Sequence, residues 1–152
     1  MNNKETLQKI ASDLHSAGYN CSQSVFGALA PEMGMERETA LMVAAPLGGG
    51  IGRTGQTCGA VTGALLALGL VYGNKSPDGA AKDRNYQIAR QFMAHFVAKH
   101  GSLSCRELLG CDISTPEGLA KARERGLFKA VCDGYVQDAV EIARAMLEPP
   151  QE

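Results

Sequence analysis

Residues 57–72 read TCGAVTGALLALGLVY and contain the longest apolar run of the chain, from Ala60 to Tyr72. The run is shorter than the roughly 20 apolar residues that a transmembrane helix needs. We therefore expect a buried core helix that begins after a capping residue, Thr57. The large apolar and sulfur side chains that this helix carries are Cys58, Leu65, Leu66, Leu68 and Val71.

Helical periodicity continues on both sides of this stretch. Segments with apolar residues at helical spacing are 7–14, 25–29, 36–45, 89–97 and 136–147. The long helix is predicted to turn Ala89, Phe92, Met93, Phe96 and Val97 inward. The last helix is predicted to bury Val136, Ala139, Val140, Ala143 and Leu147.

No segment alternates with period two for more than a few residues, and no repeat or linker divides the chain. The sequence thus predicts an all-α fold, a single-domain helical bundle of about five to seven helices with a Gly-rich loop. We expect this domain to cover residues 1–148 and to be followed by a frayed tail at 149–152.

The Gly-rich segment is 47–56, which reads LGGGIGRTGQ and is predicted to be a loop. It contains the string GIGRTG, which matches the dinucleotide fingerprint as letters. However, the fingerprint follows a strand, whereas the segment before this string is helical and ends at Pro46. We therefore expect no nucleotide, and interpret the glycines as allowing backbone N–H groups to approach whatever Cys58 contacts.

Arg53 is the only charged residue within 39–74, so it is a candidate to face an anionic group. The alternative is a solvated arginine at a loop tip. Gly59, Gly63 and Ala67 recur every four residues, and close packing of another helix is a sufficient reason for that spacing. The residues expected to contact a cofactor are Gly49, Gly50, Arg53 and Gly59.

Four of the five cysteines are predicted to stand at helix starts. Three follow a residue that favours the N-cap position, in the pairs Asn20-Cys21, Thr57-Cys58 and Ser104-Cys105. Cys132 lies at the expected start of the last helix. Free backbone N–H groups and the helix dipole favour the thiolate there, the form that binds metals and attacks disulfides. The alternative is that these cysteines are small buried hydrophobes.

Several classes of function lack support in the sequence. There is no Cys-x-x-Cys pair, zinc knuckle or haem attachment motif. None of His15, His95 and His100 pairs with a carboxylate and a nucleophile at a recognisable spacing, which disfavours a Cys–His hydrolase. A formal net charge of −1 gives no electrostatic case for nucleic acid or a membrane surface. Without an apolar signal region, we expect a protein of the reducing cytoplasm.

With these features in place, the chain resembles the C-GCAxxG-C-C family of redox-active proteins. The matching segments are 20–21, 48–50, 58–63, 105–110 and 126–132. The resemblance implies four cooperating cysteines, namely Cys21, Cys58, Cys105 and Cys132. Cys111 lies outside this set, and Gln56 stands where many relatives are expected to carry glutamate. A related domain of split-Soret cytochromes c is associated with haem and an iron–sulfur centre, of which only the cluster is compatible with this chain.

These observations leave three functions open. The leading hypothesis is electron transfer by an iron–sulfur cluster that the four cysteines bind. The alternatives are a thiol–disulfide oxidoreductase or redox sensor, and an accessory protein with structural zinc. We expect neither haem nor nucleotide. The sequence does not identify the redox partner, decide whether the protein is an enzyme, or fix the oligomeric state, a homodimer being one option.

Two expectations follow for the cysteines themselves. The four family cysteines should converge in one pocket, with Cys111 outside it. Cys58 should be acidic and readily alkylated, provided that its sulfur faces the Gly-rich loop and not the core, because backbone N–H donors would then stabilise its thiolate.

Overall fold

The computed structural model describes residues 2–147, which form an all-α domain, as the sequence predicts. Its α-helices are α1 (Lys4–Ser16), α2 (Cys21–Leu29), α3 (Arg37–Ala44), α4 (Gly48–Ile51), α5 (Gly59–Tyr72), α6 (Gly79–His100), α7 (Cys105–Leu109), α8 (Pro116–Glu124) and α9 (Asp133–Leu147). Shorter segments are η1 (Ala30–Met33), η2 (Ala45–Leu47) and the π-helical η3 (Phe128–Cys132). The frayed tail expected at 149–152 lies outside the described residues.

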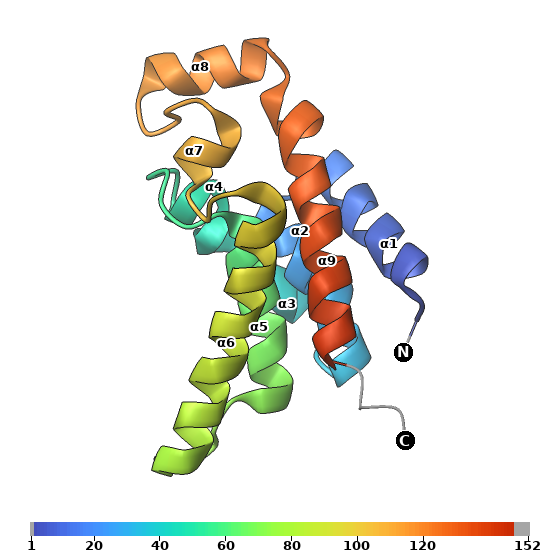
Figure 1. Cartoon of the computed structure of the whole chain (residues 1–152). Coiled ribbons are helices and arrows are strands. Elements are labelled where there is room, and N and C mark those ends of the chain that lie inside the picture. The colour runs from blue at the N-terminus through green and yellow to red at the C-terminus, as the bar shows by residue number, and fades with distance from the viewer. Residues whose placement is uncertain (1, 148–152) are drawn as a thin grey trace.

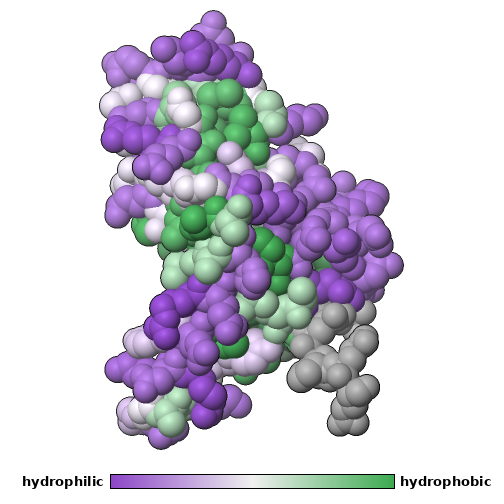
Figure 2. Space-filling view, viewed as in Figure 1, coloured by the Kyte–Doolittle hydropathy of each residue, from purple (hydrophilic) through white to green (hydrophobic). Residues whose placement is uncertain are grey.

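The helices divide into a packed body and one end that carries the short elements. In the body, α2 packs against α1, α3, α5 and α9, and α5 also packs against α6. The short helices α4, α7 and α8 gather at one end, the upper end in Figure 1. Apolar side chains reach the surface below α8 at this end and are surrounded by hydrophilic residues (Figure 2). No helix of the described range is both long and apolar enough to span a bilayer.

The most deeply buried helix is α2, and it carries two hydroxyl groups into the core. Ser22 and Ser24 are fully buried. The Ser24 hydroxyl donates to the Asn20 carbonyl at 2.8 Å, and the Thr62 hydroxyl donates to the Ser22 hydroxyl at 3.3 Å. Asn20 is the N-cap of α2, as its sequence position predicts, and it forms a capping box with Gln23. These bonds satisfy polar groups that burial would otherwise penalise.

The core helix differs from its prediction at its start. Its N-cap is Cys58, not Thr57, and Thr57 instead forms an isolated antiparallel bridge with Ser104. At the other end, Val71 is 46% exposed, as Val97 of α6 is at 38%. Val97 was expected to face inward. Val71 lies near the end of α5 at which α5 and α6 project beyond the other helices (Figure 1), whereas Val97 lies near the opposite end of α6. The five inward residues predicted for α9 are all buried.

The predicted glycine loop contains a left-handed turn. Its φ angles are positive at every residue from Gly49 to Arg53, between 62° and 68°. Two of these residues, Ile51 and Arg53, are not glycine, and each costs about 1–2 kcal/mol in this conformation. A backbone hydrogen bond from Gln56 N to Gly50 O, 2.9 Å long, closes the loop that follows this turn. Such strain persists only where the surrounding structure enforces it.

Candidate functional site

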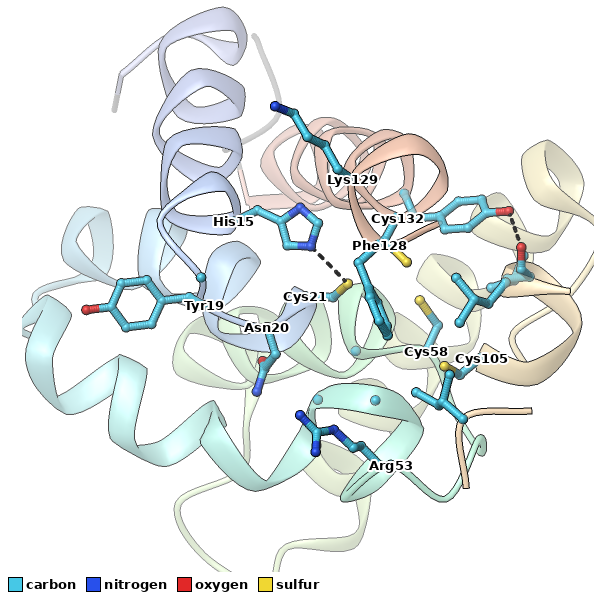
Figure 3. A pocket seen from close by; sticks show the side chains of 18 of the residues that line it. His15, Tyr19, Asn20, Cys21, Arg53, Cys58, Cys105, Phe128, Lys129 and Cys132 are labelled. Carbon is cyan, nitrogen blue, oxygen red and sulfur yellow. Dashed lines mark hydrogen bonds between the residues drawn. The ribbon is translucent and has the colours of Figure 1, made fainter. Parts of the chain in front are cut away.

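A pocket of about 650 Å³ lies where α2, α4, α5, α7 and η3 meet. This volume is within the range of about 300–1,000 Å³ that is typical of small-molecule sites. Its lining includes Cys21, Cys58, Cys105 and Cys132. Figure 3 shows their sulfur atoms gathered around a common space. Cys111 does not line the pocket, and its thiol donates to the Gly118 carbonyl at 3.2 Å.

The Thr57–Ser104 bridge places two of the cysteines together. Cys58 and Cys105 directly follow the bridged residues, on segments that are far apart in the sequence. Their backbone N–H groups donate across the bridge, at 2.7 Å and 2.6 Å. A short antiparallel pairing thus fixes the starts of α5 and α7 side by side.

Small residues on α5 bring Cys21 to the same place. A Cβ atom on Gly59 would lie 2.9 Å from Ser22 N and 3.1 Å from the Cys21 Cβ, and one on Gly63 would lie 2.6 Å from Ser22 O. The glycine face of α5 therefore allows the close helix contact that its spacing predicts, here against the first turn of α2. As a consequence, Cys21 lies at the start of α5, near Cys58.

The glycines of the loop make room for two further side chains. A Cβ atom on Gly50 would lie 2.6 Å from the Cys105 Cβ, and one on Gly49 would lie 2.8 Å from the Arg53 Cγ. Gly49, Arg53 and Gly59 line the pocket, whereas Gly50 packs against Cys105 outside the lining. Contact of these four residues with a cofactor stays a prediction.

The position of Cys132 differs from its prediction. It does not begin a helix but ends the π-helical segment η3, which leads directly into α9. Because the helical backbone continues through Cys132, this residue does not have the free N–H groups of a helix start. Single π-helical turns are frequent at functional sites, and this one directs Phe128, Lys129 and Cys132 into the pocket lining.

His15 is a site residue that the sequence did not reveal. Its Nε2 lies 3.9 Å from the Cys21 Sγ (Figure 3), and its Nδ1 lies 3.7 Å from the Asp133 Oδ1. Asp133 is held by Ser12, which donates at 2.9 Å, and by Gln137, which donates at 2.7 Å. No recognisable sequence spacing joined a histidine to a thiol and a carboxylate, and here the fold brings the three side chains together. The residues come from α1, α2 and α9, so no linear motif contains them.

The acidity expected for Cys58 was also wrong. Burial raises the pKa of its thiol to about 12, although the backbone N–H groups of Ala60 and Val61 act in the opposite direction. The predicted backbone donors are thus present, but loss of water has the larger effect because Cys58 is only 5% exposed. Burial likewise raises the pKa of Cys105, to about 11.

Cys132 is the pocket thiol whose pKa is lowered. Interaction with the Cys21 thiol lowers the pKa of Cys132 against the opposing effect of burial. The same interaction, together with burial, raises the pKa of Cys21 well above its ordinary value. The first thiolate to form in this pocket is therefore expected on Cys132.

In metal-free reduced protein, we expect iodoacetamide to modify Cys132 before Cys58. Alkylation requires the thiolate, and a thiol of pKa about 12 is ionised in only about one molecule in 10⁴ at pH 8. Cys21→Ala, which removes the thiol that lowers the pKa of Cys132, should slow the Cys132 reaction. Peptide mass spectrometry after timed labelling measures both rates. Faster labelling of Cys58 would contradict this order.

The donor set can be compared with the cofactors that the sequence suggested. Within residues 2–147, no group of three or more histidine, cysteine or acidic side chains is arranged to hold a single metal ion. A structural zinc site requires four ligands within about 2.3 Å of one point. Cysteine thiolates are the usual ligands of iron–sulfur clusters as well as of zinc, and the pocket gathers four cysteines.

Comparison with known proteins agrees with this set of cysteines. A family model described as "Putative redox-active protein (C_GCAxxG_C_C)" matches residues 19–146. The matched range contains all the cysteines of the pocket. No curated protein and no solved structure matches the chain.

Proposed function

Since the chain belongs to the C_GCAxxG_C_C family of redox-active proteins, we propose that its four-cysteine pocket binds an iron–sulfur cluster and transfers electrons. The observation that carries the proposal is the convergence of four thiols from four separate segments on one cavity. Packing alone gives no reason for four cysteines to meet, because isolated buried cysteines serve equally well as small apolar residues. The cluster would supply one-electron chemistry.

The residues around the cysteines have defined parts in this proposal. The N–H groups of Ala60 and Val61 favour a charged Cys58 sulfur, so they would stabilise it as a ligand thiolate. Burial of Cys58 and Cys132 keeps water from their sulfurs, and solvent access affects the potential of a cluster. Ligand thiols must lose their protons. His15 Nε2, next to the Cys21 Sγ, is placed to take that proton, and Asp133 faces the other ring nitrogen.

A second candidate function has its own observation. Cys21 and Cys132 line the same pocket, and each thiol shifts the pKa of the other, which supports a reactive pair. In this candidate, the Cys132 thiolate attacks a disulfide substrate and releases one substrate thiolate. The Cys21 sulfur then attacks the mixed disulfide, which forms the Cys21–Cys132 bond and releases the second substrate thiol. The substrate gains the two electrons that the cysteine pair loses.

Protein that is produced and purified without oxygen is expected to be brown and to contain iron and acid-labile sulfide in near-equal amounts. Absorption spectroscopy and elemental analysis measure both. Cys111→Ser is the matched control and should keep the colour, because Cys111 lies outside the pocket.

Protein that stays colourless after attempted cluster reconstitution would contradict the proposal that the pocket binds a cluster. A Cys21–Cys132 disulfide in that protein after oxidation would then support the second candidate, and one tightly bound zinc per chain would support a structural site.

A further inference from the structure

Three basic side chains line the four-cysteine pocket without any carboxylate beside them. They are Arg53, Arg123 and Lys129, and no aspartate or glutamate is among the lining residues. All three are exposed. Within residues 2–147, none of them forms an ion pair with an acidic side chain. The edge of the pocket therefore carries positive charge that the described part of the protein does not neutralise.

The three cations reach the pocket from separate segments. Arg53 follows α4, Arg123 lies near the end of α8, and Lys129 lies in η3. Figure 3 shows Arg53 and Lys129 on opposite sides of the sulfur atoms. Three basic residues from separate parts of the chain thus line one pocket, although the whole chain has a formal net charge of only −1.

The position of Arg53 is enforced by the backbone. Its φ angle is +65°, in the left-handed region that non-glycine residues rarely adopt. The path of its side chain also depends on Gly49, since a Cβ atom there would lie 2.8 Å from the Arg53 Cγ. A freely solvated arginine at a loop tip needs neither feature. Backbone strain of this kind is concentrated at binding and catalytic sites.

We propose that the pocket admits a small anionic substrate, whose carboxylate, phosphate or sulfur-oxyanion group is held by Arg53, Arg123 and Lys129 beside the cysteines. Guanidinium groups bind such oxygens through paired hydrogen bonds, and lysine adds a compact charge. The cavity of about 650 Å³ has the size of a small-molecule site. The inference names the substrate class of the redox site proposed above and rests on that function, but its test needs neither a cluster nor turnover.

Two alkylating reagents of similar size make the test possible. Iodoacetate carries a negative charge and iodoacetamide is neutral, and both react with thiolates by displacement of iodide. The experiment uses reduced, metal-free full-length protein and compares the alkylation rate with iodoacetate to that with iodoacetamide at each cysteine. This ratio of rates should be about tenfold higher at the pocket cysteines than at Cys111, because the basic residues attract the anionic reagent. Cys111 serves as the internal reference because it lies outside the pocket. Added salt should reduce the difference.

Variants distinguish the effect of Arg53, Arg123 and Lys129, here called the cationic rim, from the effect of general surface charge. The triple variant Arg53→Gln, Arg123→Gln, Lys129→Gln should lower the ratio at the pocket cysteines to that at Cys111. Arg125→Gln removes an equal charge from a neighbouring exposed residue that does not line the pocket, and it should leave the ratio unchanged. Equal ratios in the wild type and the triple variant, or an equal loss in the Arg125 variant, would overturn the proposal.

A second measurement applies if neither reagent reaches the pocket thiols. Inorganic sulfate, added at constant ionic strength, should cause saturating NMR shifts of the Gly52 and Arg53 amides that the triple variant lacks. Shifts that do not saturate, or that persist in the triple variant, would indicate adventitious binding only. Either result would overturn the proposal that these three residues hold an anion. Iron and sulfide analysis of the same variants is independent of this result. If the wild-type protein binds a cluster but its pocket cysteines show no preference for the anionic reagent, only the proposed substrate class is contradicted. If the preference is present but no cluster is bound, only the proposed function is contradicted.

Discussion

Cys58→Ser is expected to abolish cluster binding, or thiol turnover in the second candidate, while the helical content stays nearly unchanged. The sulfur is lost from the centre of the pocket, and the serine hydroxyl is a poor substitute ligand for iron. The fold should tolerate this change because Cys58 occupies the N-cap of α5, where serine is among the preferred residues. A serine oxygen can accept from the N–H groups at the second and third helix positions, Ala60 and Val61. Iron content and circular dichroism measure the two effects.

The matched control for this variant is Cys111→Ser. Its thiol donates only to the Gly118 carbonyl, and a serine hydroxyl can make the same bond. We expect full metal content and full redox response in this variant. The assignment of the site would be wrong if Cys111→Ser lost these properties while Cys58→Ser retained them.

Gly63→Ala is expected to destabilise the protein by about 1–3 kcal/mol or more, through overpacking between α2 and α5. The added methyl group would lie 2.6 Å from Ser22 O and 3.1 Å from Ser22 Cα. Both are backbone atoms, so a side-chain rotation cannot relieve the contact and the two helices must separate. That separation would also move Cys21 away from Cys58. Urea denaturation measures the stability, and iron content measures the effect on the site.

Gly69→Ala is the control on the same helix. A Cβ atom at Gly69 has no neighbour within 4 Å, so the substitution meets no obstacle. Alanine in a helix is favoured over glycine by about 0.5–1 kcal/mol, so this variant should be slightly more stable than the wild type. Equal stability changes in the two variants would show that contact with α2 does not constrain α5.

The position of Cys21 in the site depends on the packing of α2 against α5, which Gly63 permits and Gly69 does not affect. The contact that brings Cys21 to the start of α5 is the same contact that packs α2 against α5. Stability and function are thus coupled through one helix crossing. Other substitutions that widen this crossing should reduce cluster content before they unfold the protein, because a site that binds through several ligands requires their correct geometry.

Local features of this protein are readable in its sequence because they depend on neighbours a few residues away. The apolar spacing of 136–147 identifies the buried face of α9, and Asn20 with Gln23 identifies the start of α2. The glycine spacing of α5 predicts a close helix contact. The choice of four cysteines from five came from the family motif, and the structure places those four in one pocket and leaves Cys111 outside it.

Tertiary structure alone decided the properties that depend on burial and on distant segments. The pKa of Cys58 rises to about 12 because packed neighbours exclude water, and this outweighs the local N–H groups that the sequence indicated. His15 meets Cys21 and Asp133 only because α1 packs against both α2 and α9. The cationic rim likewise needs three segments to converge. Helix periodicity and capping are short-range, whereas desolvation and charge interactions depend on which helices finally pack together.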